Sequence, residues 1–202
     1  MQITIDKKTG VLLAIIALLG ATVISFAVNR DGDHMDNNGM GGHRSHNSTS
    51  ANYTGADIMF LQMMIPHHQQ AVDISNLAMK TSKDTELLAL AKKIAADQAV
   101  EIVQMKAWLK DAGAGTDMGH SMEGMGGMLN DAELSALNAE TGTKFDILWL
   151  KGMTGHHDGA IHMTTMIRDA SNPDIKAFGE KVITDQTAQI EQMKVMLQRL
   201  SK

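Results

Sequence analysis

The chain contains no cysteine, only two prolines and few aromatic residues among its 202 residues. The absence of cysteine excludes disulfide scaffolds, thiolate zinc sites, iron–sulfur clusters and thiol catalysis. Because strands are enriched in aromatic residues, their scarcity argues against a β-sandwich or a β-barrel. The formal net charge is −5, with 18 basic and 23 acidic side chains, so the chain also lacks the basic excess expected of a nucleic-acid-binding protein.

Methionine and histidine are unusually prominent instead. The chain has 17 methionines and nine histidines, although methionine is normally not among the commonest residues. Thioether sulfur is a poor ligand for zinc, calcium or magnesium. It suits Cu(I), and by the same softness Ag(I), and imidazole is a further copper ligand. The composition therefore makes copper a candidate metal. It also makes the positions of the methionines and histidines along the chain informative.

The N-terminus is predicted to be a targeting segment. Residues 11–28 carry no charged side chain, and two lysines precede them. This run is at the lower limit of a membrane span, and its basic flank favours a cytoplasmic N-terminus. Ser25-Phe26-Ala27 resembles a cleavage site, so residues 1–30 are either a cleaved signal peptide or a membrane anchor. In both cases the rest of the chain is exported, to the periplasm or the cell surface.

Two glycine-rich segments carry further methionines and histidines. Residues 31–53 are expected to be a disordered linker, and residues 113–130 a loop between helices. A methionine in such a segment has no core to fill, which favours metal capture over packing, with an adaptable contact surface for a partner as the alternative. The loop supplies the candidate ligands Met118, His120, Met122, Met125 and Met128, and the linker carries His34, Met35, Met40, His43 and His46.

The segments at about 54–112 and 143–201 are copies of one pattern, related by a shift of 89 residues. Each copy reads as two amphipathic helices joined by a short turn, and such an αα-hairpin cannot bury its apolar face alone. We therefore predict an all-α domain over residues 54–202, in which two hairpins form an antiparallel four-helix bundle. The predicted helices are 54–80, 84–111, 143–170 and 173–200, with a short helix at 131–139.

Polar side chains interrupt the predicted core stripes at equivalent positions of the two copies. His67 and His156 fall on the apolar stripes, each one turn after a methionine, and a second histidine follows each directly. Gln98, Glu101, Gln186 and Gln189 interrupt the facing stripes, where we expect them to hydrogen-bond the histidines. The pattern predicts either a metal site or a purely structural polar layer. The candidate ligands are Met64, His67, His68, Met105, Met153, His156, His157, His162, Met163 and Met193.

Two sequence strings resemble the domain-of-unknown-function family 305. They are M-M-I-P-H-H-Q-Q-A, residues 63–71, and G-M-T-G-H-H-D-G-A-I-H-M, residues 152–163. The resemblance covers about residues 57–200 and implies a ferritin-like four-helix bundle with exported, copper-binding members of the CopM type. It implies a role in copper resistance. The residues at the matching motif positions are Met64, His67, His68, Met153, His156, His157 and Met163. The copies differ at Asp73 and Ile74, which stand where the second copy has His162 and Met163.

Three classes of function remain open at this point. The favoured one is an exported protein, not an enzyme, that sequesters or delivers Cu(I), or Ag(I), through methionine and histidine and binds more than one equivalent. A ferritin-like metalloenzyme would need Glu-x-x-His pairs, and the chain has none. A helical interaction module without metal, tethered to the membrane by an uncleaved N-terminus, is the third.

Overall fold

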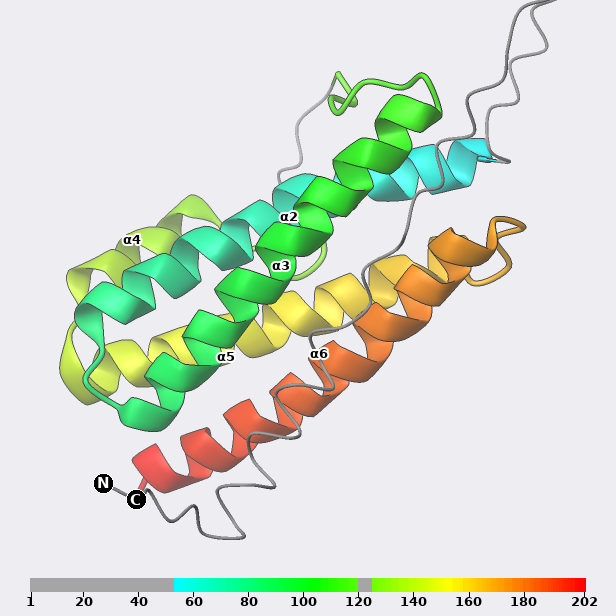
Figure 1. Cartoon of the computed structure of the whole chain (residues 1–202). Helices are drawn as coiled ribbons and strands as arrows, with labels where there is room; N and C mark the ends of the chain where they lie inside the picture. Colours follow the sequence, from blue (N-terminus) through cyan, green and yellow to red (C-terminus); the bar gives the residue numbers. More distant parts are fainter. Residues whose placement is uncertain (1–52, 120–124) are drawn as a thin grey trace, which may run out of the picture. The chain divides into compact units, whose positions relative to one another are not determined.

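The computed structural model describes residues 53–119 and 125–202 (Figure 1). The predicted signal or anchor and nearly all of the first linker lie outside the described residues, as do the candidate ligands His120 and Met122. Within the described ranges the chain forms the helices α2 (Gly55–Thr81), α3 (Thr85–Asp111), α4 (Asp131–Ala139), α5 (Gly142–Met163) and α6 (Pro173–Leu200), and the 3₁₀ turn η1 (Thr164–Ile167).

Local side-chain bonds account for where the helices begin. Thr54 and Asp57 form a capping box at the start of α2, and Asn130 and Glu133 form the predicted one at the start of α4. Asn172 caps α6, whose first residue is Pro173, a position where the missing N–H costs nothing. These starts agree with the predicted ones to within a residue or two.

The prediction of an unbroken helix to residue 170 is wrong. The α-helix ends at Met163, and the chain continues as the 3₁₀ turn η1. The hydroxyls of Thr164 and Thr165 donate to the carbonyls three residues earlier, at 2.7 and 2.8 Å, which competes with α-helical bonding. The tighter turn lets Ile167 pack against Gly179, where an added Cβ would lie only 2.9 Å from the isoleucine Cδ1.

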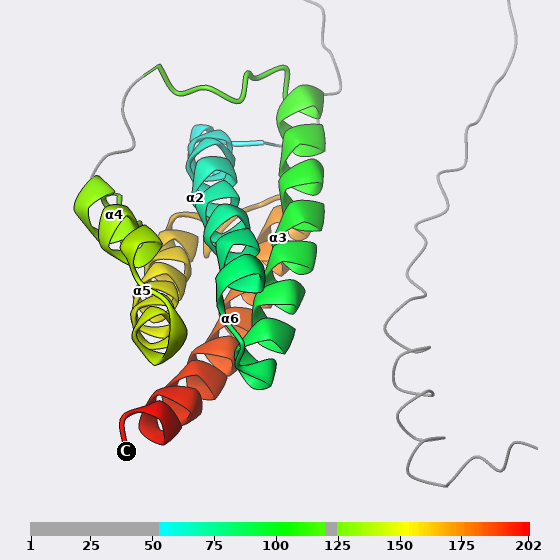
Figure 2. The same ribbon diagram turned by 90° about the vertical axis from the view of Figure 1, so that its left-hand side faces the viewer.

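The four long helices form the predicted antiparallel bundle (Figures 1 and 2). The hairpin partners α2 and α3 pack along their length, as do α5 and α6, and α2 contacts α5 across the hairpins. The short helix α4 lies against α5. No helix in residues 53–119 or 125–202 is both long and apolar enough to cross a membrane.

The core consists of two apolar clusters on either side of a polar layer. One cluster contains the C-terminal half of α2 with Trp149, and the other contains the N-terminal half of α2 with Phe60. Between the two sets, each long helix contributes buried polar residues that belong to neither cluster. These residues are His67, His68, Gln98, His156, His157, Gln186 and Gln189.

Candidate metal centre

Four histidines form the centre of the polar layer. His67 and His68 come from α2, His156 and His157 come from α5, and all four have no exposed surface. The rings of His67 and His156 face each other across the bundle, with centroids 3.7 Å apart. The neighbouring rings within each pair are separated by 6.5 Å in α2 and by 6.3 Å in α5. The near-equal spacing shows that the sequence repeat is also a structural repeat at this site.

Hydrogen bonds hold one nitrogen of three of these rings. His68 Nε2 donates to the Glu101 carboxylate at 2.9 Å, and His157 Nε2 donates to the Gln189 side-chain oxygen at 2.6 Å. His67 Nε2 donates to the carbonyl oxygen of Gly126 at 3.3 Å. In each of these rings a proton on Nε2 leaves Nδ1 as the nitrogen with a free lone pair.

The remaining ring nitrogens are buried without a partner. Within the described residues, Nδ1 of His67, His68 and His157 accepts no hydrogen bond, and both nitrogens of His156 are unpaired. A buried nitrogen without a partner is costly, and in native proteins it calls for an explanation. An imidazole with one nitrogen fixed by a carboxylate, an amide or a carbonyl is also the arrangement found around metal-bound histidines.

Burial keeps the imidazoles of His67, His156 and His157 neutral. Burial, reinforced by the neighbouring His68, lowers the pKa of His67 to about 3. Burial lowers the pKa of His157 to about 4 even though the bond to Gln189 opposes it. Burial also holds the pKa of His156 well below its ordinary value, with His67 adding to the effect. Neutral imidazole is the form that binds metal, so no proton has to leave first.

The two halves of the layer differ in charge. Burial raises the pKa of Glu101, but its bonds to His68 and Lys181 outweigh burial and leave the pKa lowered. Lys181 lies 2.7 Å from Glu101 and bridges to Asp185, so the layer has an ionic side. The equivalent partner of His157 is the neutral Gln189. The predicted bonds from Glu101 and Gln189 are thus confirmed, whereas Gln98 and Gln186 have no partner for their side-chain oxygens within the described chain.

The predicted methionine ligands lie on both sides of the histidines. Met64, Met105 and Met163 belong to the cluster that contains Phe60, and Met153 and Met193 belong to the cluster that contains Trp149. Each is buried, and the first copy's pair, Met64 and Met105, corresponds to Met153 and Met193 in the second. The fold therefore gathers nine predicted side chains around one layer, four imidazoles and five thioethers.

A glycine contact that the sequence analysis missed covers one side of this layer. Gly126 and Gly127 lie so close to α5 that a Cβ on Gly159 would overlap the Gly126 carbonyl, and a Cβ on Gly127 would overlap the carbonyl of Gly155. Gln70 fixes the loop by bonding both backbone groups of Leu129, at 2.8 and 2.9 Å. The spacing of glycines along α5 was the available signal, because glycine lets two backbones approach closely.

The other predicted ligands lie away from the four histidines or at the edge of the layer. His162 is exposed at the end of α5. Met118 lines a cavity of about 390 Å³ that also borders Pro66. Met125 is half-buried against the apolar cluster that contains Phe60, and Met128 is half-buried in the same loop. The structure does not place these four in the layer.

The donor set favours a soft ion over a hard one. Residues 53–119 and 125–202 contain no group of three or more histidine, aspartate or glutamate side chains positioned to hold a metal ion. Imidazole and thioether are the soft donors that the layer and the two adjoining clusters offer. That combination suits Cu(I) and Ag(I), while magnesium and calcium prefer oxygen ligands.

Comparisons with known proteins give the family and a set of relatives. Solved structures with the same fold include a DUF305 protein from Streptomyces coelicolor, named as secreted, with 30% identity and a TM-score of 0.68 over 72% of this chain and 92% of that one. A DUF305 fragment from Deinococcus radiodurans has 28% identity and a TM-score of 0.67, over 72% and 97% of the two chains.

CopM in the Cu(I)-bound form is a further structural relative. It has 30% identity and a TM-score of 0.61, over 73% of this chain and 97% of its own. CopM is also known in Cu(II)-bound and Ag-bound forms. No curated protein matches the chain. The sequence profile "Domain of unknown function (DUF305)" matches residues 57–197, most of the chain, so the protein belongs to the DUF305 family.

Proposed function

We propose that the protein binds Cu(I), and by the same chemistry Ag(I), in the buried histidine–methionine layer, as an exported protein that sequesters or delivers copper. The observation that carries the proposal is the set of buried ring nitrogens on four histidines that lack hydrogen-bond partners within the described residues. A soft monovalent ion accepts lone pairs from imidazole and thioether and needs few ligands. The similarity to CopM, which binds copper and silver, supports this assignment.

The layer serves binding rather than catalysis in this proposal. Burial lowers the pKa values of His67, His156 and His157, and the histidine-bearing helices are fixed by packing on both sides. A ferritin-like di-iron site would need inward Glu-x-x-His motifs, which the sequence lacks. Export is supported by the predicted N-terminal targeting segment and by the Streptomyces coelicolor relative, which is named as secreted.

The test is a Cu(I) titration of the full chain against a competing colorimetric chelator. The double variant His67→Leu/His156→Leu removes the two facing imidazoles while keeping apolar volume in the layer. We expect it to bind Cu(I) at least 100-fold more weakly than the wild type. The matched control is His162→Leu, which removes an exposed histidine from the end of α5 and should leave the affinity unchanged.

Measurements on the metal-free proteins complete the design. Circular dichroism and thermal unfolding show whether the double variant keeps its helical fold. A folded double variant that binds Cu(I) as tightly as the wild type would refute a site in the layer. If the double variant does not fold, the Glu101→Gln variant, which removes the charge that pairs with His68 and Lys181, replaces it in the titration.

A further inference from the structure

The outer face of α3 carries exposed apolar side chains. Val100 and Val103 are 70% and 69% exposed, the most exposed large apolar side chains in the described ranges. Ala96 and Ala107 are also exposed and continue the line by one turn at each end. At 3.6 residues per turn, these four residues lie on the side of α3 opposite to buried Met105. We call them the outer stripe; their spacing of 4, 3 and 4 residues is the one by which two helices pack together.

The bundle itself does not require an apolar outer stripe. The second turn is one residue shorter, so α6 corresponds to α3 with a shift of 88 residues. At the positions of Val100 and Val103, α6 carries Ala188 and Glu191. Glu191 is exposed and pairs with Lys194 at 2.7 Å. Because α6 packs into the same bundle without the two valines, packing within the chain does not account for them on α3.

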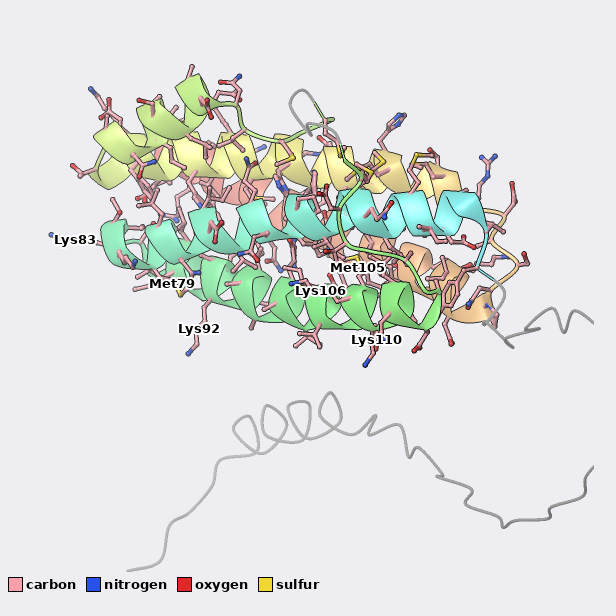
Figure 3. All side chains as sticks on the ribbon, turned by 90° about the horizontal axis from the view of Figure 1, so that it is seen from above. Met79, Lys83, Lys92, Met105, Lys106 and Lys110 are labelled. Atoms are coloured by element: carbon pink, nitrogen blue, oxygen red, sulfur yellow. The ribbon has the colours of Figure 1, made fainter. Side chains whose placement is uncertain are left out.

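Charged residues border the outer stripe, with one sign on each side. Lys92 and Lys106 lie on the side toward α2, where Lys106 lines a cavity together with residues of α2. Asp97 and Asp111 lie on the other side, the side of Glu101, whose carboxylate pairs with a lysine of α6. Figure 3 shows the Lys92 side chain pointing away from the bundle. The outer face of α3 is therefore an apolar line between a basic edge and an acidic edge.

The two edges are complementary to those of a second, parallel copy of α3. With the outer stripe at the a and d positions of a heptad, the two lysines take g positions and the two aspartates take e positions. In a pair of parallel helices, each g residue meets the e residue five positions later on the partner helix. Lys92 then meets Asp97 of the second copy, and Lys106 meets Asp111. An antiparallel pair would instead place lysine beside lysine and aspartate beside aspartate.

These charges contribute little within a single chain. None of the ion pairs in residues 53–119 and 125–202 involves Lys92, Lys106 or Asp111. Asp97 pairs with Lys93 on the exposed surface, an interaction of the kind that is worth little. Asp111 is the last residue of α3, where an acidic side chain is unfavourable beside the negative end of the helix dipole.

We propose that the outer face of α3 is the interface of a parallel homodimer. The α3 helices of two copies pack along the outer stripe, and the two lysine–aspartate pairs formed by each edge set the direction and the register. The stripe is short and its side chains are small, so the association is weak and depends on concentration. The proposal is independent of metal binding, because the histidine layer lies on the opposite, buried side of α3.

The absence of native cysteine allows the interface to be tested by specific crosslinking. In a parallel dimer each Val100 meets the same residue of the second copy. We therefore expect Val100→Cys in the full chain, oxidised with diamide in the absence of metal, to form disulfide-linked dimers at least tenfold faster than Val195→Cys. Val195 is the matched control because it is 65% exposed on α6, at the position equivalent to Ala107.

Charge exchange tests the direction and the register. In the Val100→Cys background, Lys92→Glu/Lys106→Glu places acid against acid across the interface, and Asp97→Lys/Asp111→Lys places base against base. Each variant alone should crosslink at least fivefold more slowly than the parent. An equimolar mixture should recover the parent rate and give mainly the mixed dimer, identified by mass spectrometry. Circular dichroism checks that these surface substitutions leave the helices intact.

Three results would overturn the homodimer. The first is an equal rate for Val100→Cys and Val195→Cys. The second is the absence of linked dimers from Val100→Cys, which is expected if another segment of the chain or a different protein covers this face. The third is a mixture of the two charge variants that crosslinks no faster than either variant alone. The proposed metal site is unaffected by any of these results, since its side chains are unchanged in every variant.

Discussion

Acid should unfold the metal-free protein through its buried histidines. Burial lowers the pKa of His67 to about 3 and that of His157 to about 4, and it holds the pKa of His156 well below the ordinary 6.5. Above about pH 7.5 neither the folded nor the unfolded chain protonates these rings appreciably, so they add little pH dependence there. Below pH 6.5 the unfolded chain takes up protons that the folded chain does not, and the free energy of unfolding falls.

The size of this loss follows from the number of histidines. Each histidine that stays neutral in the fold contributes a slope of about 1.4 kcal/mol per pH unit once the unfolded state is protonated. Three such residues give about 4 kcal/mol per unit. By pH 5 each has cost about 2 kcal/mol, a combined loss of about 6 kcal/mol. Since small domains are stable by about 5–15 kcal/mol, the unfolding transition should lie near pH 5 or below.

Urea unfolding of chelator-washed protein, followed by circular dichroism between pH 7.5 and 5, measures this slope. The variant His156→Leu should reduce the slope by about a third. It should also keep or raise the stability at pH 7, because it replaces an imidazole with two unpaired nitrogens by an apolar group of similar size. His162→Leu is the control and should leave the slope unchanged. A wild-type slope no steeper than that of one histidine would refute the neutral, buried layer.

Three further predictions concern the loop, the helix and the ionic side of the layer. Gly159→Ala should destabilise the fold by about 2 kcal/mol or more because its Cβ overlaps the loop backbone, whereas Gly155→Ala, which meets open space, should stabilise it by up to about 1 kcal/mol. Thermal unfolding measures the melting temperatures of both variants. A Gly159→Ala variant that is more stable than Gly155→Ala would contradict the contact between the loop and α5. Pro66→Ala should raise the free energy of unfolding, measured in urea, by up to about 3 kcal/mol, because proline removes a backbone hydrogen bond inside α2. An unchanged free energy of unfolding would show that α2 accommodates the proline at no cost. Glu101→Gln should weaken Cu(I) binding about 10- to 100-fold by removing the charge behind His68, and an unchanged affinity in the chelator titration would exclude that role.

The helices were predictable because their signals are local. Thr54, Asn130 and Asn172 each bond to a backbone group within three residues, so a short stretch of sequence is enough to place a helix start. The end of α5 was not predictable in this way. The change to η1 depends on the hydroxyl bonds of Thr164 and on the contact of Ile167 with Gly179, which belongs to another helix.

The layer was predictable because the sequence carries it twice. A single buried histidine has many explanations, but His67 and His156 fall at equivalent places on two apolar stripes. The loop contact was not predictable, because no pattern in residues 113–130 specifies which carbonyl meets which helix. Glycine spacing on α5 is compatible with many partners, and only the packed structure identifies Gly126.

The unpaired ring nitrogens of the layer carry an energetic cost that bears on the proposed metal site. Five of its eight ring nitrogens lack a partner among the described residues: Nδ1 of all four histidines and Nε2 of His156. At about 1–3 kcal/mol for each unsatisfied buried group, the cost is comparable with the whole stability of a small domain. Leucine at these positions would join the two apolar clusters into one core and remove that cost. A purely structural layer gains nothing from open lone pairs, whereas the soft ion proposed for the layer would give them a partner. This cost is the physical argument for that proposal over a purely structural polar layer.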